Sequence, residues 1–232
     1  MIKEAIEKIL NLASPYLVKM GEREYSNQPL HAIKEPTPDT LTIHTLTGIV
    51  DYIKDSGDLG GAALFIHVES PEAVCIYSNL MPAWDQRKRY LKAQLAHADE
   101  YPFGKWLDPE TFIISLQAQF VADGTTAALL SMVSTIKDEV VKTSADDGVS
   151  QTITAKAGIA LVEYVKIPNP VVLRPYRTFM EVTQPASSFV LRLRRGVEIS
   201  LHEADGGQWE LEAIQAIKTF LALALPEVPV IA

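Results

Sequence analysis

The sequence predicts an α+β fold with antiparallel sheets, packed helices and a β-rich C-terminal half closed by a C-terminal helix. Alternating polar and apolar residues dominate residues 150–203, a pattern typical of antiparallel strands. Apolar residues recur at helical spacing in residues 2–13, 46–56 and 208–225. A chain of 232 residues can also bury a sizeable core.

The composition is that of a globular protein, with 47% hydrophobic and 22% charged residues. The net charge of −8 argues against a general nucleic-acid binder, because such proteins bind by neutralising phosphates. Cys75 is the single cysteine, so no disulfide can form within one chain and a reducing cytoplasm is expected. Residues 1–12 mix acidic and basic side chains, and no apolar run is long enough for a membrane span.

We expect three regions: 1–40, 41–148 and 149–232, the last two of which can form one domain. The first contains an amphipathic helix over residues 2–13 and an extended arm. Ser14-Pro15 either ends this helix or leads into a second short helical piece. Residues 21–40 are polar with three prolines and predict a long connection.

The middle region is predicted to open with a short strand at residues 41–43 and a helix capped by Thr45. Two apolar runs flank Ser70-Pro71-Glu72, which predicts a β-hairpin, and residues 89–96 alternate as a third antiparallel strand.

Two helices complete this region. Asp108 is expected to cap the first, which runs to Gly124, and Thr125 or Thr126 starts the second, which runs to Thr143. Residues 144–150 are polar, so we expect a turn there and a boundary between the two halves.

The last region is predicted to be a series of antiparallel strands followed by a helix and an extended tail. The expected strands are 150–158, 160–167, 171–176, 178–183, 187–195 and 197–203. The apolar side of the final helix is expected to carry Leu211, Ile214, Ile217, Leu221 and Leu225, and to pack on the sheet built from residues 159–201. The tail, 226–232, is expected to lie over another part of the structure.

Arginines are the candidate binding or subunit-contact residues. Five lie in the β region: Arg174, Arg177, Arg192, Arg194 and Arg195. Arg192 and Arg194 should share one sheet face, opposite Phe189, Leu191 and Leu193. A second basic cluster holds Arg87 and Arg89, beside Trp84 and Tyr90. These residues either form a solvated face paired with Glu163, Glu181 or Glu198, or contact a neighbouring subunit, or bind an anion or nucleic acid.

No catalytic, metal or cofactor pattern is found, so no enzyme, metal or cofactor is predicted. Three segments place histidine near acids, but no set of four ligands with metal spacing exists; the segments hold His67 with Glu69, His97 with Asp99 and Glu100, and His202 with Glu203 and Asp205. Cys75 lies in an apolar run and is interpreted as a small buried hydrophobe rather than a nucleophile.

Four stretches resemble the YfdQ family of phage and prophage proteins. They are HTLTGIVDYI (44–53), FIHVES with AVCIYSNL (65–80), KWLDPETFIISLQAQFVADG (105–124) and FVLRLRRGVEISL (189–201). The resemblance implies a phage-encoded protein of the bacterial host cytoplasm, in a family without an assigned activity or catalytic residues.

These observations favour a non-enzymatic phage protein that self-assembles into a homo-oligomer. Two alternatives stay open: an accessory factor that binds nucleic acid in phage recombination or replication, and a binder of an anionic small molecule or inhibitor of host defence. Self-assembly requires apolar surfaces that meet another copy. Both alternatives require the arginines to converge on a ligand.

Overall fold

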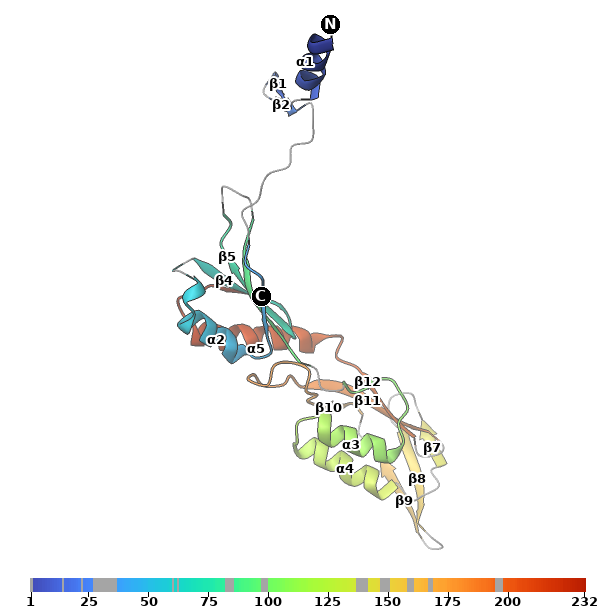
Figure 1. Cartoon of the computed structure of the whole chain (residues 1–232). Coiled ribbons are helices and arrows are strands. Elements are labelled where there is room, and N and C mark those ends of the chain that lie inside the picture. The colour runs from blue at the N-terminus through green and yellow to red at the C-terminus, as the bar shows by residue number, and fades with distance from the viewer. Residues whose placement is uncertain are drawn as a thin grey trace. The chain divides into compact units, whose positions relative to one another are not determined.

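The computed structural model divides the chain into two compact units, Met1–Thr37 and Pro38–Ala232 (Figure 1). The structure describes residues 2–13, 15–21, 23–26, 37–59, 61, 63–81, 86–96, 100–136, 142–146, 151–157, 161–166, 169–194 and 198–232. None of the helices in these ranges is long and apolar enough to cross a membrane.

The first unit consists of a helix and a hairpin. The predicted amphipathic helix is α1 (Ile2–Ala13). The prediction of a second helical piece is wrong, because β1 (Leu17–Met20) pairs antiparallel with β2 (Arg23–Ser26). Gly21 has φ of 67°, which suits the tight turn between the strands. The polar connection predicted from residue 21 therefore begins with a strand, and residues 27–36 lie outside the described part of the chain.

The second unit contains a five-stranded sheet in the order β13-β4-β5-β6-β3. Its centre is the predicted hairpin of β4 (Leu64–Ser70) and β5 (Ala73–Ser78), followed by β6 (Arg89–Gln94) as the predicted third antiparallel strand. The two edges are parallel: β3 (Leu41–Ile43) runs alongside β6, and β13 (Val230–Ile231) alongside β4. The tail therefore forms an edge strand of this sheet.

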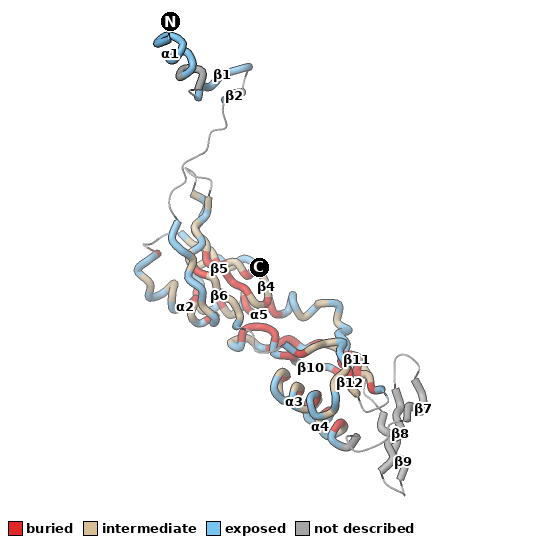
Figure 2. The backbone as a smooth tube through the Cα atoms, turned by 45° about the vertical axis from the view of Figure 1, so that its right-hand side comes forward, coloured by how far each residue is buried: buried red, intermediate tan, exposed pale blue. Residues whose placement is uncertain are grey.

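Helices α2 (Leu46–Asp55) and α5 (Gln208–Ala224) pack on the five-stranded sheet, and a short 3₁₀ turn, η1 (Gly57–Leu59), follows α2. Thr45 caps α2 as predicted, since its hydroxyl accepts a hydrogen bond from the Gly48 N–H at 3.2 Å. The shared core, which we call the first core, consists of buried residues of the sheet, the helices and one loop (Figure 2). They are Leu46, Ile49, Ile66, Val68, Val74, Ile76, Leu91, Ala93, Phe179, Ile217, Leu221 and Leu225.

The final helix is present, but it packs on a different sheet from the one predicted. Ile217 and Leu221 lie in the first core with β4, β5 and β6, not on the sheet of residues 159–201. Leu211 is 71% exposed, although it was expected on the buried side. The reason is that the buried stripe runs through Ala213, Ile217 and Leu221 at four-residue spacing, which turns Leu211 toward solvent.

A second core lies between a three-stranded antiparallel sheet and two helices. The strands are β10 (Val171–Leu173), β11 (Ser187–Arg194) and β12 (Glu198–Glu203), in that order, and the helices are α3 (Pro109–Gln119) and α4 (Gly124–Ile136). Its buried residues include an aromatic cluster. They are Tyr101, Phe112, Leu116, Phe120, Leu129, Val133, Val171, Leu173, Phe189, Leu191, Leu193, Ile199 and Leu201.

Helix α3 begins where the sequence predicts and ends earlier. The Asp108 carboxylate accepts hydrogen bonds from the N–H groups of Glu110 and Thr111, both at 3.0 Å. The helix stops at Gln119 instead of Gly124 because the next residues pair with another segment. Phe120 bridges Pro175, and the Val121 N–H donates to the Arg174 carbonyl at 2.9 Å.

A second three-stranded antiparallel sheet contains β7 (Lys142–Asp146), β8 (Gln151–Ala157) and β9 (Leu161–Lys166). The second predicted helix is present as α4, but its predicted end at Thr143 and the predicted turn from residue 144 are wrong, because Lys142–Asp146 is a strand. Thr143 pairs with Ile153, so pairing with a partner strand rich in threonine overrides a weak helical spacing. Residues 137–141 and 147–150 lie outside the described ranges.

Residues 174–186, which we call the junction loop, connect β10 to β11. The strand predicted over residues 178–183 is wrong, because this segment bonds to other elements through its side chains. Phe179 is fully buried in the first core. The Thr178 hydroxyl donates to the Pro71 carbonyl at 2.6 Å, and the Glu181 carboxylate accepts from the Leu46 N–H at 2.8 Å at the start of α2. The junction loop thus joins the second sheet to the elements of the first core.

The buried Gln184 side chain holds the junction loop in shape. Its oxygen accepts from the N–H groups of Arg177 and Thr178 at 3.1 and 3.2 Å. Its nitrogen donates to the carbonyls of Thr178 and Phe179 at 3.1 and 3.2 Å. One amide therefore satisfies four backbone groups that no strand partner reaches.

Replacement of Gln184 by Leu should lower the free energy of unfolding by about 3 kcal/mol, because several buried backbone groups lose their partners. Chemical denaturation of the full chain measures this change. The control is Gln215→Leu on the exposed side of α5, which should change the stability by less than about 0.5 kcal/mol. Equal effects of the two changes would show that Gln184 does not hold the loop.

Candidate functional site

Arg192 and Arg194 lie on the predicted face of β11. Phe189, Leu191 and Leu193 are buried on the opposite face, which confirms the alternation. Arg194 is exposed, and its Nε lies 2.5 Å from a carboxylate oxygen of Glu198 on β12. This hydrogen bond raises the pKa of Arg194 and lowers that of Glu198. The Arg194 guanidinium also lies 4.6 Å from the centre of the Trp106 ring. Arg194 therefore matches the solvated, Glu198-paired interpretation.

The remaining surface arginines lie on separate elements. Arg174 is exposed at the start of the junction loop. The pKa of Asp123 is lowered chiefly by a hydrogen bond from the Thr126 N–H, and the charge of Arg174 adds a smaller effect. Arg87 lies over the Phe65 ring at 5.1 Å, and Arg89 donates to the Thr40 hydroxyl at 3.3 Å. Arg195 and Trp84 lie outside the described residues. The described candidate arginines thus divide between residues 87–89 at the start of β6, the junction loop and β11.

Arg177 differs from the other described arginines because it is buried, with 9% of its surface exposed. One of its terminal nitrogens contacts the Glu203 carboxylate at 2.5 Å, and the other donates to the Ser187 hydroxyl. The second nitrogen also lies 4.0 Å from the Asp205 carboxylate. The guanidinium therefore joins the junction loop to the end of β12 and to the segment that leads into α5.

Aromatic rings surround the same guanidinium. Its central carbon lies 4.0 Å from the centre of the Trp209 ring, a distance typical of a cation–π contact. Phe103 and Phe189, at 5.9 and 5.8 Å, stack on each other on another side. Trp209 lies in the first turn of α5, so Arg177 connects α5 to the aromatic cluster of the second core.

The carboxylates around Arg177 offset only part of the effect of burial on its pKa. Burial lowers the pKa of Arg177, while Glu203, Asp205 and Glu210 oppose that change. Arginine keeps its proton in proteins, so the cluster contains a buried positive charge. Burial raises the pKa of Asp205, but hydrogen bonds with Ser187 and Gly207 and the charge of Arg177 outweigh it and hold this pKa below its usual value.

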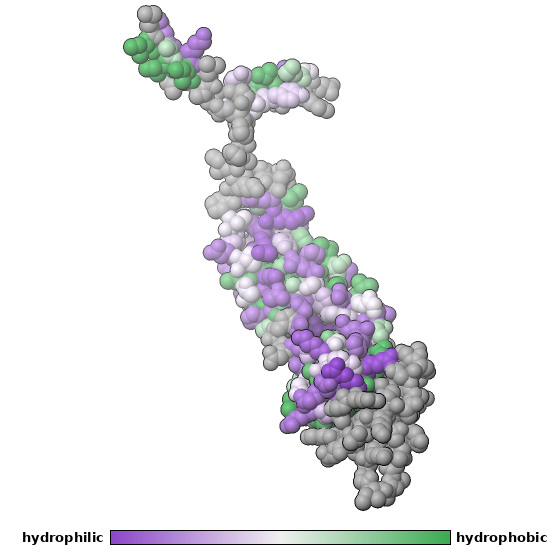
Figure 3. All heavy atoms as spheres, turned by 90° about the vertical axis from the view of Figure 1, so that its right-hand side faces the viewer, coloured by the Kyte–Doolittle hydropathy of each residue, from purple (hydrophilic) through white to green (hydrophobic). Residues whose placement is uncertain are grey.

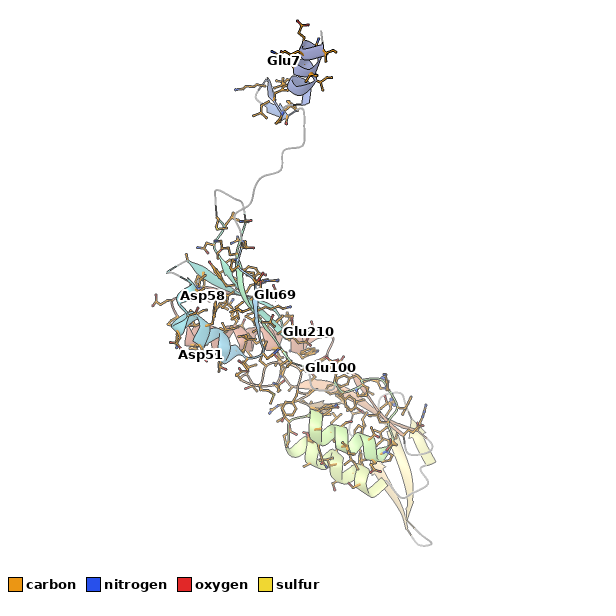
Figure 4. All side chains as sticks on the ribbon, in the orientation of Figure 1. Glu7, Asp51, Asp58, Glu69, Glu100 and Glu210 are labelled. Atoms are coloured by element: carbon orange, nitrogen blue, oxygen red, sulfur yellow. The ribbon has the colours of Figure 1, made fainter. Side chains whose placement is uncertain are left out.

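A cavity of about 180 Å³ lies beside Arg177. Three carboxylate side chains, Glu72, Glu100 and Glu203, are among the residues that line it, and Glu100 is labelled in Figure 4. Aromatic residues line it as well, among them Tyr101 and Trp209. The Tyr101 hydroxyl is buried without a hydrogen-bond partner in the described part of the structure.

Sequence reasoning placed Arg177 with the surface arginines and did not find its surroundings. It did note Glu203 and Asp205, but as acids near His202, whereas in the structure both face Arg177. His202 contacts the Ser200 hydroxyl at 3.1 Å instead. The only sequence signal for the cluster was an isolated arginine within the short segment between two prolines, Pro175 and Pro185.

The other candidate groups stay apart from this cluster. His67 and Glu69 share one face of β4 as expected, and Glu69 accepts a hydrogen bond from the Tyr77 hydroxyl at 2.9 Å. No group of three or more His, Cys, Asp or Glu side chains suited to a metal ion occurs among the described residues. Burial raises the pKa of Cys75 to about 11, so this fully buried thiol is protonated at neutral pH.

Comparison of the chain with protein-family models, with curated proteins and with solved structures finds no match. The site consists of a fixed guanidinium, aromatic rings and carboxylates around a cavity.

The change Arg177→Ala should destabilise the protein by about 3 kcal/mol, because it leaves Asp205 as a largely buried charge without its partner. Thermal or chemical unfolding of the full chain measures the loss. The control Arg194→Ala breaks an exposed ion pair and should leave the unfolding midpoint nearly unchanged. If both variants unfold at the same midpoint, the buried charge does not stabilise this unit.

The Asp205 carboxyl should make stability depend on pH. Its pKa is lower in the folded protein than its usual value of 3.8, so the ionised form stabilises the fold above that value. This contribution is lost as the pH falls through the folded-state pKa. The stability difference between the natural protein and Asp205→Asn should therefore be largest near neutral pH and shrink in acid. A difference that grows in acid would contradict the assignment.

Proposed function

We propose that this is a non-enzymatic protein that assembles into homo-oligomers through its N-terminal unit, Met1–Thr37. The observation that carries the proposal is the exposure of this unit. Each of its residues with a described burial state is exposed, including those of α1 and of the hairpin β1–β2 (Figure 2). The unit thus has secondary structure but no described buried core of its own.

The exposed residues include an apolar stripe on α1. Ile2, Ile6 and Ile9 are 80%, 52% and 65% exposed, and their spacing places them on one side of the helix. Leu17 and Met20 of β1 are also exposed. Figure 3 shows apolar residues of α1 in green on the side of the molecule that it presents.

Neither element is expected to be stable alone. A 12-residue helix is marginal in water unless its apolar face packs on something, and an isolated two-stranded hairpin is equally marginal. Burial of the isoleucine stripe between copies supplies the missing apolar contact, since each fully buried isoleucine contributes about 1.5–3 kcal/mol.

The charges of α1 favour another copy as the partner. The helix carries Lys3 and Lys8 against Glu4 and Glu7, so its formal charge is zero and two copies do not repel each other. The stripe of three isoleucines is much smaller than the ~800 Å² per partner of a standard interface. This small area favours a bundle of several helices, in which each stripe contacts more than one neighbour.

The proposed biological setting rests on the resemblance to the YfdQ family of phage and prophage proteins. It suggests a phage-encoded protein of the bacterial host cytoplasm. The single cysteine agrees with a reducing compartment. Homo-oligomers commonly use closed symmetry, with terminal segments that join neighbouring copies, so the proposed role is structural.

Replacement of both Ile6 and Ile9 by Gln should dissociate the oligomer. Glutamine keeps the helix propensity high, so the change removes the apolar stripe and not the helix. Size-exclusion chromatography with light scattering on the full chain should give a multiple of 25.6 kDa for the natural protein and 25.6 kDa for the variant.

The matched control is Glu7→Gln with Lys8→Gln, which introduces the same residues on the polar side of α1, leaves its formal charge at zero and should keep the oligomer. Glu7 is labelled in Figure 4. If the natural protein has a mass of 25.6 kDa at every concentration tested, the proposal is wrong.

A further inference from the structure

We infer that the cavity beside Arg177 binds a small organic cation, with an alkylammonium or guanidinium group as the recognised part. The inference is independent of the proposed self-assembly, because the cavity is lined by residues of Pro38–Ala232. It rests on the charge of the lining, on its aromatic rings and on a buried hydroxyl.

The charge of the cavity is negative. Glu72, Glu100 and Glu203 line it together with a single cationic residue, Arg177, among the described residues. The charge of Arg177 is already compensated, because Glu203 lies 2.5 Å and Asp205 4.0 Å from its nitrogens. Three carboxylates and one guanidinium line the cavity, so the formal charge of its described lining is negative and favours a cation over an anion.

The aromatic lining suits the same class of ligand. Phe103, Tyr176 and Trp209 line the cavity with Tyr101, so four aromatic side chains surround a space next to carboxylates. Ammonium and guanidinium groups are attracted to aromatic faces, most strongly to indole. The chain already uses this contact, since Arg177 lies over the Trp209 ring at 4.0 Å.

The Tyr101 hydroxyl is the strongest sign that a ligand is expected. Tyr101 is 5% exposed and lines the cavity, and its hydroxyl has no hydrogen-bond partner among the described residues. A buried hydroxyl without a partner costs free energy, and nearly all buried polar groups in proteins are satisfied. An N–H group of a bound cation would donate to this oxygen and remove the cost.

The size of the cavity limits the ligand. A volume of about 180 Å³ is below the ~300 Å³ at which pockets for drug-sized molecules begin. It accommodates a guanidinium or a short alkylamine but not a nucleotide. The cation can be a free metabolite or the side chain of a lysine or arginine on another protein, because both present the same group.

Isothermal titration calorimetry of the full chain with n-propylammonium and n-propylguanidinium tests the inference. Both should bind, and propionate, which has a similar size and the opposite charge, should not. Failure of both cations to bind at millimolar concentration would overturn the inference.

Three variants locate the site. Tyr101→Phe should weaken binding about tenfold, as expected for loss of one hydrogen bond to a charged group. This variant should remain folded, because it removes a hydroxyl that has no partner among the described residues. Glu100→Gln should weaken binding at least about threefold through the lost charge. The control Glu110→Gln removes one exposed charge on α3, away from the lining, and should change the affinity by less than about twofold.

Equal losses for Tyr101→Phe and Glu110→Gln would overturn the inference, because binding would then reflect the overall negative charge. Capped tripeptides with a central lysine or arginine distinguish the two sources of cation. If they bind more tightly than the free cations and respond to Tyr101→Phe, a protein side chain is the ligand. If only the free cations bind, the ligand is a small molecule.

Discussion

Burying a guanidinium costs several kcal/mol unless carboxylates and hydrogen-bond acceptors surround it. In this protein the buried guanidinium is that of Arg177, and the acids and acceptors around it come from three segments. The junction loop must bring the arginine inside, β12 must end with Glu203 beside it, and the chain must turn at Asp205 before α5 begins. Because α5 belongs to the first core and β12 to the second, the contacts of Arg177 link the two cores, together with those of Thr178, Phe179 and Glu181.

Many helices and strands were predictable, because the spacing of apolar residues shows which side of an element is buried and because capping residues mark where helices begin. β11 alternates with a period of two, and Thr45 and Asp108 cap helices with their own side chains. The junction loop was not predictable, because Phe179 and Gln184 are placed by contacts far away in the sequence. Periodicity describes which side of an element is buried and not which element it meets, so the partner of α5 was also missed.

The candidate site was missed for a related reason. A surface arginine and a buried one are identical in sequence, and only the convergence of Glu203, Asp205 and Trp209 distinguishes Arg177 from Arg194. The same ambiguity affects α1 and α2, which are both amphipathic. The apolar face of α2 lies in the first core, whereas the isoleucine stripe of α1 is exposed. An amphipathic sequence predicts that the apolar face of a helix will be covered. Only the structure shows whether that face packs within its own compact unit, as for α2, or is left exposed, as for α1.

The parallel pairing of β13 with β4 has a consequence for synthesis of the chain. Val230 lies beside Ile66, so the ribosome must add every residue between them before this edge of the sheet can close. The side chains of Ile217 and Leu221, which complete the core under the same sheet, also emerge late. During translation the central hairpin therefore has one strand edge and one apolar face uncovered until the C-terminal residues are added, and both exposed features favour aggregation of the nascent chain.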